Sequence, residues 1–173
     1  MNIIDRNFSE LAHEIKNLNE KELYHRMRKA YEGVPEAARI SCMGFFERYP
    51  YWGRLDEEKG IYEEIELKQQ TLSQHIDDFI WFYDTLCDYR SRKTLYAVLN
   101  NWYRYDFEST ASAAEKTFDQ YFDLDLVRCT PNEVMADLGA YVGDTVLSYI
   151  KNYGPDCYKR IYCYEITKEN FDI

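Results

Sequence analysis

Hydrophobic residues follow a helical period through most of the chain. In the clearest stretch they recur at steps of three, four and seven residues, which places them along one face of a long helix. These residues are Ile61, Ile65, Leu72, Ile76, Phe79, Tyr83 and Leu86. A second stripe of Leu95, Val98, Leu99 and Trp102 follows Ser91, which suits an N-cap. We expect these two helices to pack as an antiparallel or crossed pair.

Three shorter helices are predicted nearer the N-terminus. Ser9 is expected to cap the first, a second pattern runs from about Glu20 to Tyr31, and Pro35 suits the first turn of a third. Gly53 and Gly60 then predict a loop before the long helix.

The hydrophobic period changes at Thr130. A short buried strand is expected over Glu133 to Leu138, closed by Gly139. A helix opened by Asp144 follows, with an inner face of Val146, Leu147 and Ile150, and Gly154-Pro155 ends it. Arg160 to Tyr164 then reads as a second strand. This order predicts a right-handed βαβ unit with parallel strands. We expect an α/β chain with a helical region at 1–129 and an α/β region at 130–173.

Composition narrows the classes of partner. The 173 residues are 46% hydrophobic and 30% charged, with a formal net charge of -10 and no run of basic residues. Such a field repels phosphate, so neither nucleic acid nor an anionic membrane is an expected partner. The five cysteines form no C-x-x-C pair, and the three histidines stand singly, so no metal site is predicted. Without a signal-peptide pattern or a membrane-length apolar run, the chain is expected in the cytoplasm.

Two glycines and three acidic residues mark the candidate site. Gly139 and Gly143 remove side chains where the strand turns into the helix, so a ligand can approach the backbone there. Glu165, at the end of the second strand, can accept hydrogen bonds from both ribose hydroxyls of a nucleoside. Asp137 and Asp144 flank the turn and would repel a pyrophosphate but attract a sulfonium and an ammonium group. S-adenosylmethionine is therefore favoured over NAD. A turn of this kind that holds no ligand remains an alternative.

Two stretches of this region resemble a known family. "EVMADLGAYVGDTVLSYIKNYG" and "YKRIYCYEITKENF" are similar to the first two motifs of the FkbM-like class I methyltransferases, D-x-G-A-x-x-G-D-T and Y-E-P-x-x-x-N-F. The matching residues are Asp137, Gly139, Ala140, Gly143, Asp144, Thr145, Tyr164, Glu165, Asn170 and Phe171. Ile166 replaces the usual proline of the second motif. The similarity covers about forty residues.

The resemblance implies a Rossmann-like fold, S-adenosylmethionine as cofactor, and O-methylation of a sugar or another small metabolite. It implies that Asp137 and the backbone from Gly139 to Gly143 hold the methionine end, and that Glu165 binds the ribose. Tyr141 and Ile166 would line the adenosine, and Tyr121 would close the pocket. The implied cofactor-binding set is Asp137, Gly139, Ala140, Tyr141, Gly143, Asp144, Thr145, Glu165, Ile166 and Tyr121. No catalytic residue is assigned, and His75, Asp88 and Arg90 are only candidates to reach a substrate.

Several expectations concern the whole protein. Ile173 falls in the first turn of the next expected helix, so we expect an N-terminal portion of a longer protein or a truncated product, with little or no methyl transfer on its own. We expect any homo-oligomer to form through the helical region or the exposed strand edge. Two other functions stay open: a helical interaction module whose βαβ tail completes a partner's sheet, or the start of an NAD-dependent enzyme. Aromatic residues, 17% of the chain, are expected mostly in the core, with an aromatic-lined ligand groove as the alternative.

Overall fold

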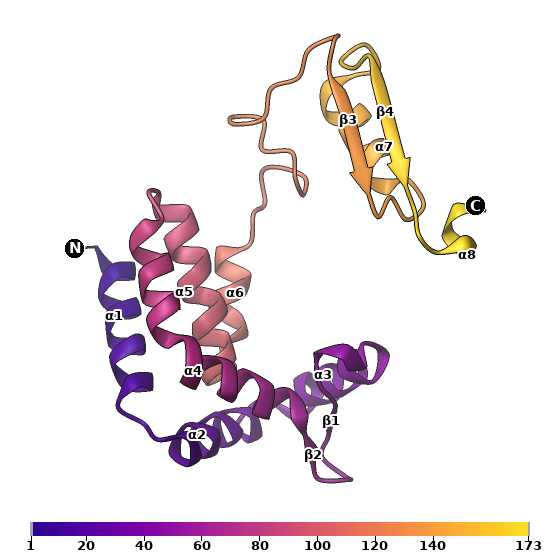
Figure 1. Ribbon diagram of the computed structural model, residues 1–173. Coiled ribbons are helices and arrows are strands. Elements are labelled where there is room, and N and C mark those ends of the chain that lie inside the picture. Colours follow the sequence, from indigo (N-terminus) through magenta and orange to yellow (C-terminus); the bar gives the residue numbers. More distant parts are fainter. Residues whose placement is uncertain (1, 173) are drawn as a thin grey trace. The chain divides into compact units, whose positions relative to one another are not determined.

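The computed structural model describes residues 2–172, and the chain divides into two compact units, Met1–Ala114 and Glu115–Ile173. Unit 1 is mainly helical, and unit 2 is α/β (Figure 1). The elements of unit 1 are α1 (Ile3–Lys16), α2 (Glu20–Glu32), α3 (Glu36–Arg48), the 3-10 turn η1 (Pro50–Trp52), β1 (Leu55–Asp56), β2 (Ile61–Tyr62), α4 (Glu63–Thr85), α5 (Tyr89–Arg104) and α6 (Phe107–Ala113). Unit 2 contains β3 (Val134–Leu138), α7 (Asp144–Tyr153), β4 (Arg160–Tyr164) and α8 (Lys168–Phe171). No helix among residues 2–172 combines the length and apolar character needed to cross a membrane.

Side-chain caps set the starts of the first helices. Asn2 and Asp5 form a reciprocal capping box at α1, and Asn19 and Glu22 do the same at α2. The prediction that Ser9 caps the first helix is therefore wrong, because the capping box starts α1 earlier and leaves Ser9 inside it. The predicted second helix is confirmed as α2.

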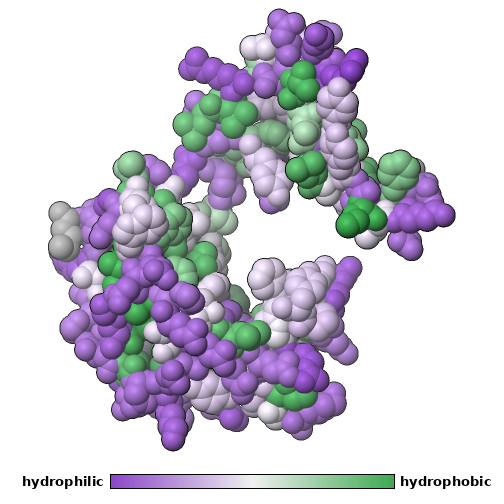
Figure 2. All heavy atoms as spheres, in the orientation of Figure 1, coloured by the Kyte–Doolittle hydropathy of each residue, from purple (hydrophilic) through white to green (hydrophobic). Residues whose placement is uncertain are grey.

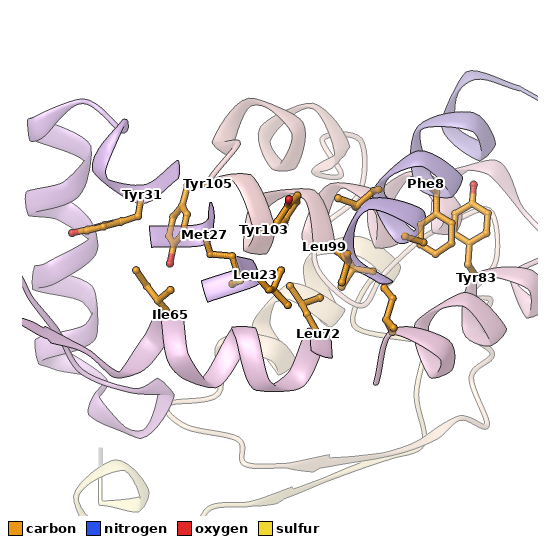
Figure 3. Close-up of a cluster of buried hydrophobic side chains, with 14 of the residues drawn as sticks. Phe8, Leu23, Met27, Tyr31, Ile65, Leu72, Tyr83, Leu99, Tyr103 and Tyr105 are labelled. Carbon is orange, nitrogen blue, oxygen red and sulfur yellow. The ribbon is translucent and has the colours of Figure 1, made fainter. Parts of the chain in front are cut away.

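The core of unit 1 lies where α1, α2, α4 and α5 meet (Figure 3). The predicted stripe of the long helix contributes Ile65, Leu72, Ile76 and Tyr83, all buried. At one end of the core the Tyr83 ring stacks on Phe8, with ring centroids 3.8 Å apart. The stripe predicted for α5 is only partly right: Leu99 is buried, but Val98 is exposed and Ala97 takes the inward position.

α3, η1 and the β1–β2 hairpin form an arm that is less buried than the helical core. No residue of α3 is fully buried. Pro35 precedes α3 as its N-cap, close to the predicted start. The predicted loop between Gly53 and Gly60 contains β1 and the turn of an unpredicted hairpin, whose two strands have two residues each. Asp56 accepts the Lys59 backbone N–H at 3.1 Å in this turn.

Unit 2 has the predicted βαβ order. β3 and β4 pair in parallel, with Val134 opposite Arg160 and Leu138 opposite Tyr164. The sequence predicted both strands and the start of α7 at Asp144 to within a residue. Positive φ angles at Gly143 and Gly154 mark the two ends of this helix.

One face of the two-stranded sheet is uncovered, and in Figure 1 it lies toward the viewer with α7 behind it. Val134, Leu138, Tyr162 and Tyr164 are all exposed. Hydrophobic residues also appear on the surface of this unit (Figure 2). The prediction of a buried first strand is therefore wrong. The prediction of Leu147 as an inner residue of the helix is also wrong, because Tyr149 occupies the buried position.

Residues 115–129 belong to unit 2, so the boundary between the units precedes the change of period at Thr130. Asp119 accepts hydrogen bonds from Ser148 Oγ at 3.0 Å and Asn152 Nδ2 at 2.9 Å, which tie the segment to α7. Phe122 is buried against the rings of Tyr149 and Tyr153. These side-chain contacts hold the irregular segment 115–129, the lead-in to β3, against α7.

Candidate functional site: the glycine turn and Glu165

The turn between β3 and α7 needs two glycines. Gly139 has φ +90° and Gly143 has φ +82°, a region that side chains rarely adopt. An added Cβ at either position would meet nothing within 4 Å, so open space adjoins the backbone at both. Tyr141 between them also has positive φ, at +48°. The turn therefore offers an unobstructed backbone surface.

The end of β4 fixes the base of this turn. The backbone N–H groups of Gly139 and Ala140 both donate to the carbonyl of Tyr164, at 2.8 and 2.9 Å. Ala140 is buried, whereas Tyr141 is exposed. The two parallel strands thus end side by side, and the chain that follows each strand lies next to the other.

Glu165 lies at this edge of the sheet and contacts the turn. Its Oε2 accepts the backbone N–H of Tyr141 at 2.8 Å. Its Oε1 accepts both the hydroxyl and the backbone N–H of Thr167, at 2.6 and 2.7 Å. These bonds, with the Thr167 hydroxyl as the largest cause, lower the pKa of Glu165 to about 2. Glu165 is therefore a fixed, ionised acceptor at neutral pH.

A small cavity of about 240 Å³ opens between the turn and Glu165. It is smaller than the pockets that usually hold drug-sized ligands. Its lining comes from the turn, the end of β4 and α8: Ala140, Tyr141, Val142, Gly143, Cys163, Glu165, Asn170 and Phe171. No lysine or arginine is among these residues, so Glu165 alone determines the formal charge of the lining.

Asp137 carries a buried polar atom without a partner. Its Oδ2 is shielded from solvent and accepts no hydrogen bond from residues 2–172. Asp137 is paired in the sheet register with Cys163, which lines the cavity. Buried oxygens are normally satisfied, so an unpaired one at a strand end marks a place where a donor can bind.

Asp144 adds a second carboxylate at the first position of α7. A carboxylate there interacts favourably with the positive end of the helix dipole. The same charge opposes the phosphate that helix N-termini often bind. The site therefore combines open backbone with a negative field.

The structure brings some of the predicted residues together around one cavity and leaves others outside its lining. Ala140, Tyr141, Gly143 and Glu165 line it. Asp137, Gly139, Asp144 and Thr145 belong to the same strand, turn and helix start without lining the cavity. Ile166 is 96% exposed and Tyr121 is 70% exposed, and neither belongs to the lining.

Sequence reasoning missed the role of Thr167. This residue supplies two of the three hydrogen bonds that hold the Glu165 carboxylate. A threonine two residues after an acid is a signal that could have identified it, because this spacing lets the acid accept from the following turn. Cys163 was not predicted as a site residue, but it lies opposite Asp137 in the strand register and lines the cavity.

The candidate substrate-side residues lie in unit 1 and have local partners. Asp88 caps α5 by accepting the Ser91 N–H at 2.8 Å, so the prediction of Ser91 as the N-cap is wrong. His75 Nδ1 lies 2.8 Å from Asp78 Oδ2. Arg90 is in the first turn of α5. Within the described part of the chain, no three acidic, histidine or cysteine side chains converge as metal ligands would.

Comparison with known proteins gives one structural likeness. No protein-family profile matches the chain, and no curated protein matches it. The fold is similar to the crystal structure of the methyltransferase FkbM from Methylobacillus flagellatus KT, with a TM-score of 0.52 and 27% sequence identity. The match covers 60% of this chain, more than unit 2 alone, and 27% of the neighbour. The chain thus has an α/β, methyltransferase-like fold over part of its length.

Proposed function

We propose that the chain binds S-adenosylmethionine at the turn from Gly139 to Gly143 and belongs to an enzyme that methylates a small-molecule hydroxyl. The observation that carries this proposal is the Glu165 carboxylate, held by three hydrogen bonds against the glycine turn. It is an acceptor-only group at the carboxyl end of a parallel strand, the usual place for a nucleoside ribose. The likeness to a methyltransferase supports the same assignment.

The charges of the site fit this cofactor. Asp137 Oδ2 lacks a donor, and the cofactor's α-ammonium group would supply one. Asp144 and Glu165 add negative charge near the turn, which favours a cationic ligand. A dinucleotide would instead bring a pyrophosphate to these carboxylates. The same residues therefore favour S-adenosylmethionine over NAD.

Glu165 has limited capacity for further hydrogen bonds. Its Oε1 already accepts two donors from Thr167, and its Oε2 accepts one from Tyr141. A carboxylate oxygen has two lone pairs, so Oε2 can accept one more donor without rearrangement. We infer that one ribose hydroxyl bonds to Oε2, and that a second bond to Oε1 requires the Thr167 side chain to turn away.

The bound cofactor would supply a methyl group activated by its sulfonium charge. The chain's own contribution would be to hold and orient it: Asp137 at the ammonium, the turn backbone beside the methionine end, and Glu165 at the ribose. Positioning of this kind supplies much of the acceleration in group transfer. We propose a sugar or a similar small metabolite as the acceptor, which the FkbM resemblance implies.

Calorimetric titration of the full chain tests the proposal. S-adenosylhomocysteine keeps the ribose, the carboxylate and the α-ammonium group but cannot react. We expect it to bind at least ten times more tightly than NAD, a difference of about 1.4 kcal/mol. Tighter binding of NAD, or binding of neither compound, would refute the proposal.

A further inference from the structure

A second cavity system lies in unit 1, remote in sequence from the glycine turn. Two adjoining hollows of about 430 and 480 Å³ open between α3, α4 and α5. They share Phe45, Phe46, Glu64 and Lys68, so we treat them as one groove. Each volume falls in the range of pockets that hold small molecules.

Aromatic rings dominate the groove. The stretch "FFERYPYW" places Phe45 and Phe46 on α3 and Tyr51 and Trp52 on η1. Trp102 and Tyr105 also belong to the lining. Trp52 is 60% exposed and Tyr51 is 72% exposed, although large rings are usually buried in cores. The aromatic-lined groove that the sequence left as an alternative is therefore present in the structure.

The floor of the groove contains a charge-compensated pair. Glu64 is only 1% exposed, forms an ion pair with Lys68, and accepts the Tyr105 hydroxyl at 2.6 Å. The Lys68 ammonium also lies 5.1 Å from the centroid of the Tyr105 ring. Because the charges of Glu64 and Lys68 cancel, an ionic ligand would disturb this ion pair. A neutral ligand would not.

The side-chain amide of Asn101 has a hydrogen-bond donor without an acceptor among residues 2–172. Asn101 lines the groove, and its Nδ2 is shielded from solvent. A buried donor without an acceptor carries a free-energy cost in the folded protein. A ligand oxygen in the groove would remove this cost. A ligand with an acceptor oxygen for Asn101 and flat apolar faces for the aromatic rings would therefore fit this lining.

We propose that the groove binds a neutral saccharide. The C–H faces of its rings would lie on the aromatic side chains, and a hydroxyl oxygen would accept from Asn101 Nδ2. A saccharide also has hydroxyl donors that can reach the Glu64–Lys68 pair. Its role as methyl acceptor rests on the proposed function, whereas its binding does not.

The tryptophans provide a direct test. The chain has three, Trp52, Trp81 and Trp102, all in unit 1. Trp52 and Trp102 line the groove, whereas Trp81 on α4 is 68% exposed and lies outside the lining. In ¹H–¹⁵N spectra of the full chain, neutral methyl glycosides should shift the indole signals of Trp52 and Trp102, saturably, and leave that of Trp81 in place. Glucuronate and glucosamine, as charged counterparts, should bind more weakly.

Matched variants complete the experiment. Trp52→Ala should weaken glycoside binding about two- to tenfold, because it removes a stacked ring, and Trp81→Ala should not change it. Both rings are exposed, so neither substitution removes core packing. Absent or unsaturable shifts, equal shifts at Trp81, or tighter binding of the charged sugars would overturn the proposal. So would groove-indole shifts that follow protein concentration without glycoside, which would indicate self-association. Because unit 2 has no tryptophan, these results are independent of S-adenosylhomocysteine binding.

Discussion

The Glu165 carboxylate and the backbone N–H of Tyr141 are joined by a hydrogen bond of 2.8 Å. This bond links the end of β4 to the turn that follows β3. It holds an acidic side chain against a stretch of backbone bounded by two glycines with positive φ. A substitution at Glu165 therefore alters both the hydrogen bond that holds the turn and the proposed contact with the ribose.

Glu165→Gln should weaken S-adenosylhomocysteine binding about tenfold or more. The amide keeps the shape of the side chain but loses the negative charge, and hydrogen bonds to charged groups contribute about 1.5–3 kcal/mol. Calorimetry measures the effect. Glu133→Gln is the matched control, because Glu133 is exposed and precedes the opposite end of β3. Equal affinity of Glu165→Gln and the wild type would exclude Glu165 from the ribose contact.

Thr167→Ala should raise the pKa of Glu165 from about 2 toward its ordinary value of 4.5. The hydroxyl bond at 2.6 Å stabilises the ionised carboxylate and is lost in the variant. Because the pKa of Glu165 is lower in the folded state, the ionised carboxylate stabilises the fold. This contribution to folding stability is fully present above about pH 4.5 and is lost as the pH falls toward 2. A carboxyl ¹³C titration measures this value.

Glu63 serves as the internal control of the titration. Arg54 lowers its pKa to about 2 in unit 1, and Thr167→Ala should leave it unchanged. A wild-type Glu165 that titrates near 4.5 would contradict the hydrogen-bond geometry.

Gly139→Ala and Gly143→Ala should each destabilise unit 2 by about 1–2 kcal/mol, because an L-residue at these positive φ values is strained. Hydrogen exchange of the β3 and β4 amides reports this stability. Gly44→Ala on α3 is the control: no positive φ is required there and no atom lies within 4 Å of the added Cβ. It should be neutral or stabilise unit 1 by up to about 1 kcal/mol. Unchanged exchange of these amides in both glycine variants would show that the turn does not require glycine at either position.

The stability of unit 1 depends on the partners of the buried Glu64, which are Lys68 and Tyr105. Lys68→Met leaves an unpaired buried carboxylate and should cost about 3–5 kcal/mol. Tyr105→Phe removes the hydroxyl bond at 2.6 Å and should cost about 2 kcal/mol. Urea unfolding followed by tryptophan fluorescence measures both, with the exposed Tyr51→Phe as control. A cost under about 1 kcal/mol for Lys68→Met would show that the buried Glu64 side chain does not depend on its ion pair with Lys68.

The sequence predicted the elements that depend on local pattern. Short apolar runs and glycine placement located β3, α7 and β4, and the three- and four-residue steps located α4 and the buried Ile65 and Leu72. The first helix began earlier than predicted because Asn2 and Asp5 cap it reciprocally. Asn2 and Asp5 have the three-residue spacing of a capping box, which is a signal in the sequence itself.

The remaining features depend on contacts that no local pattern reveals. Tyr149 is buried in place of Leu147 because Phe122, from the irregular lead-in, packs on that side of α7. The Glu165 carboxylate was predicted to face a ribose, but its fixation by Thr167 and Tyr141 depends on the turn conformation. The groove of unit 1 needs α3, α4 and α5 in place before its aromatic residues form one surface.

Chemical-shift mapping with S-adenosylhomocysteine tests the proposed nucleoside site most directly. Saturable shifts of the backbone amides from Gly139 to Thr145 and from Glu165 to Thr167, reduced in Glu165→Gln and much weaker with NAD, are the expected result. Shifts confined to unit 1, or the same shifts at lower concentrations of NAD, would contradict the assignment of this turn to S-adenosylmethionine.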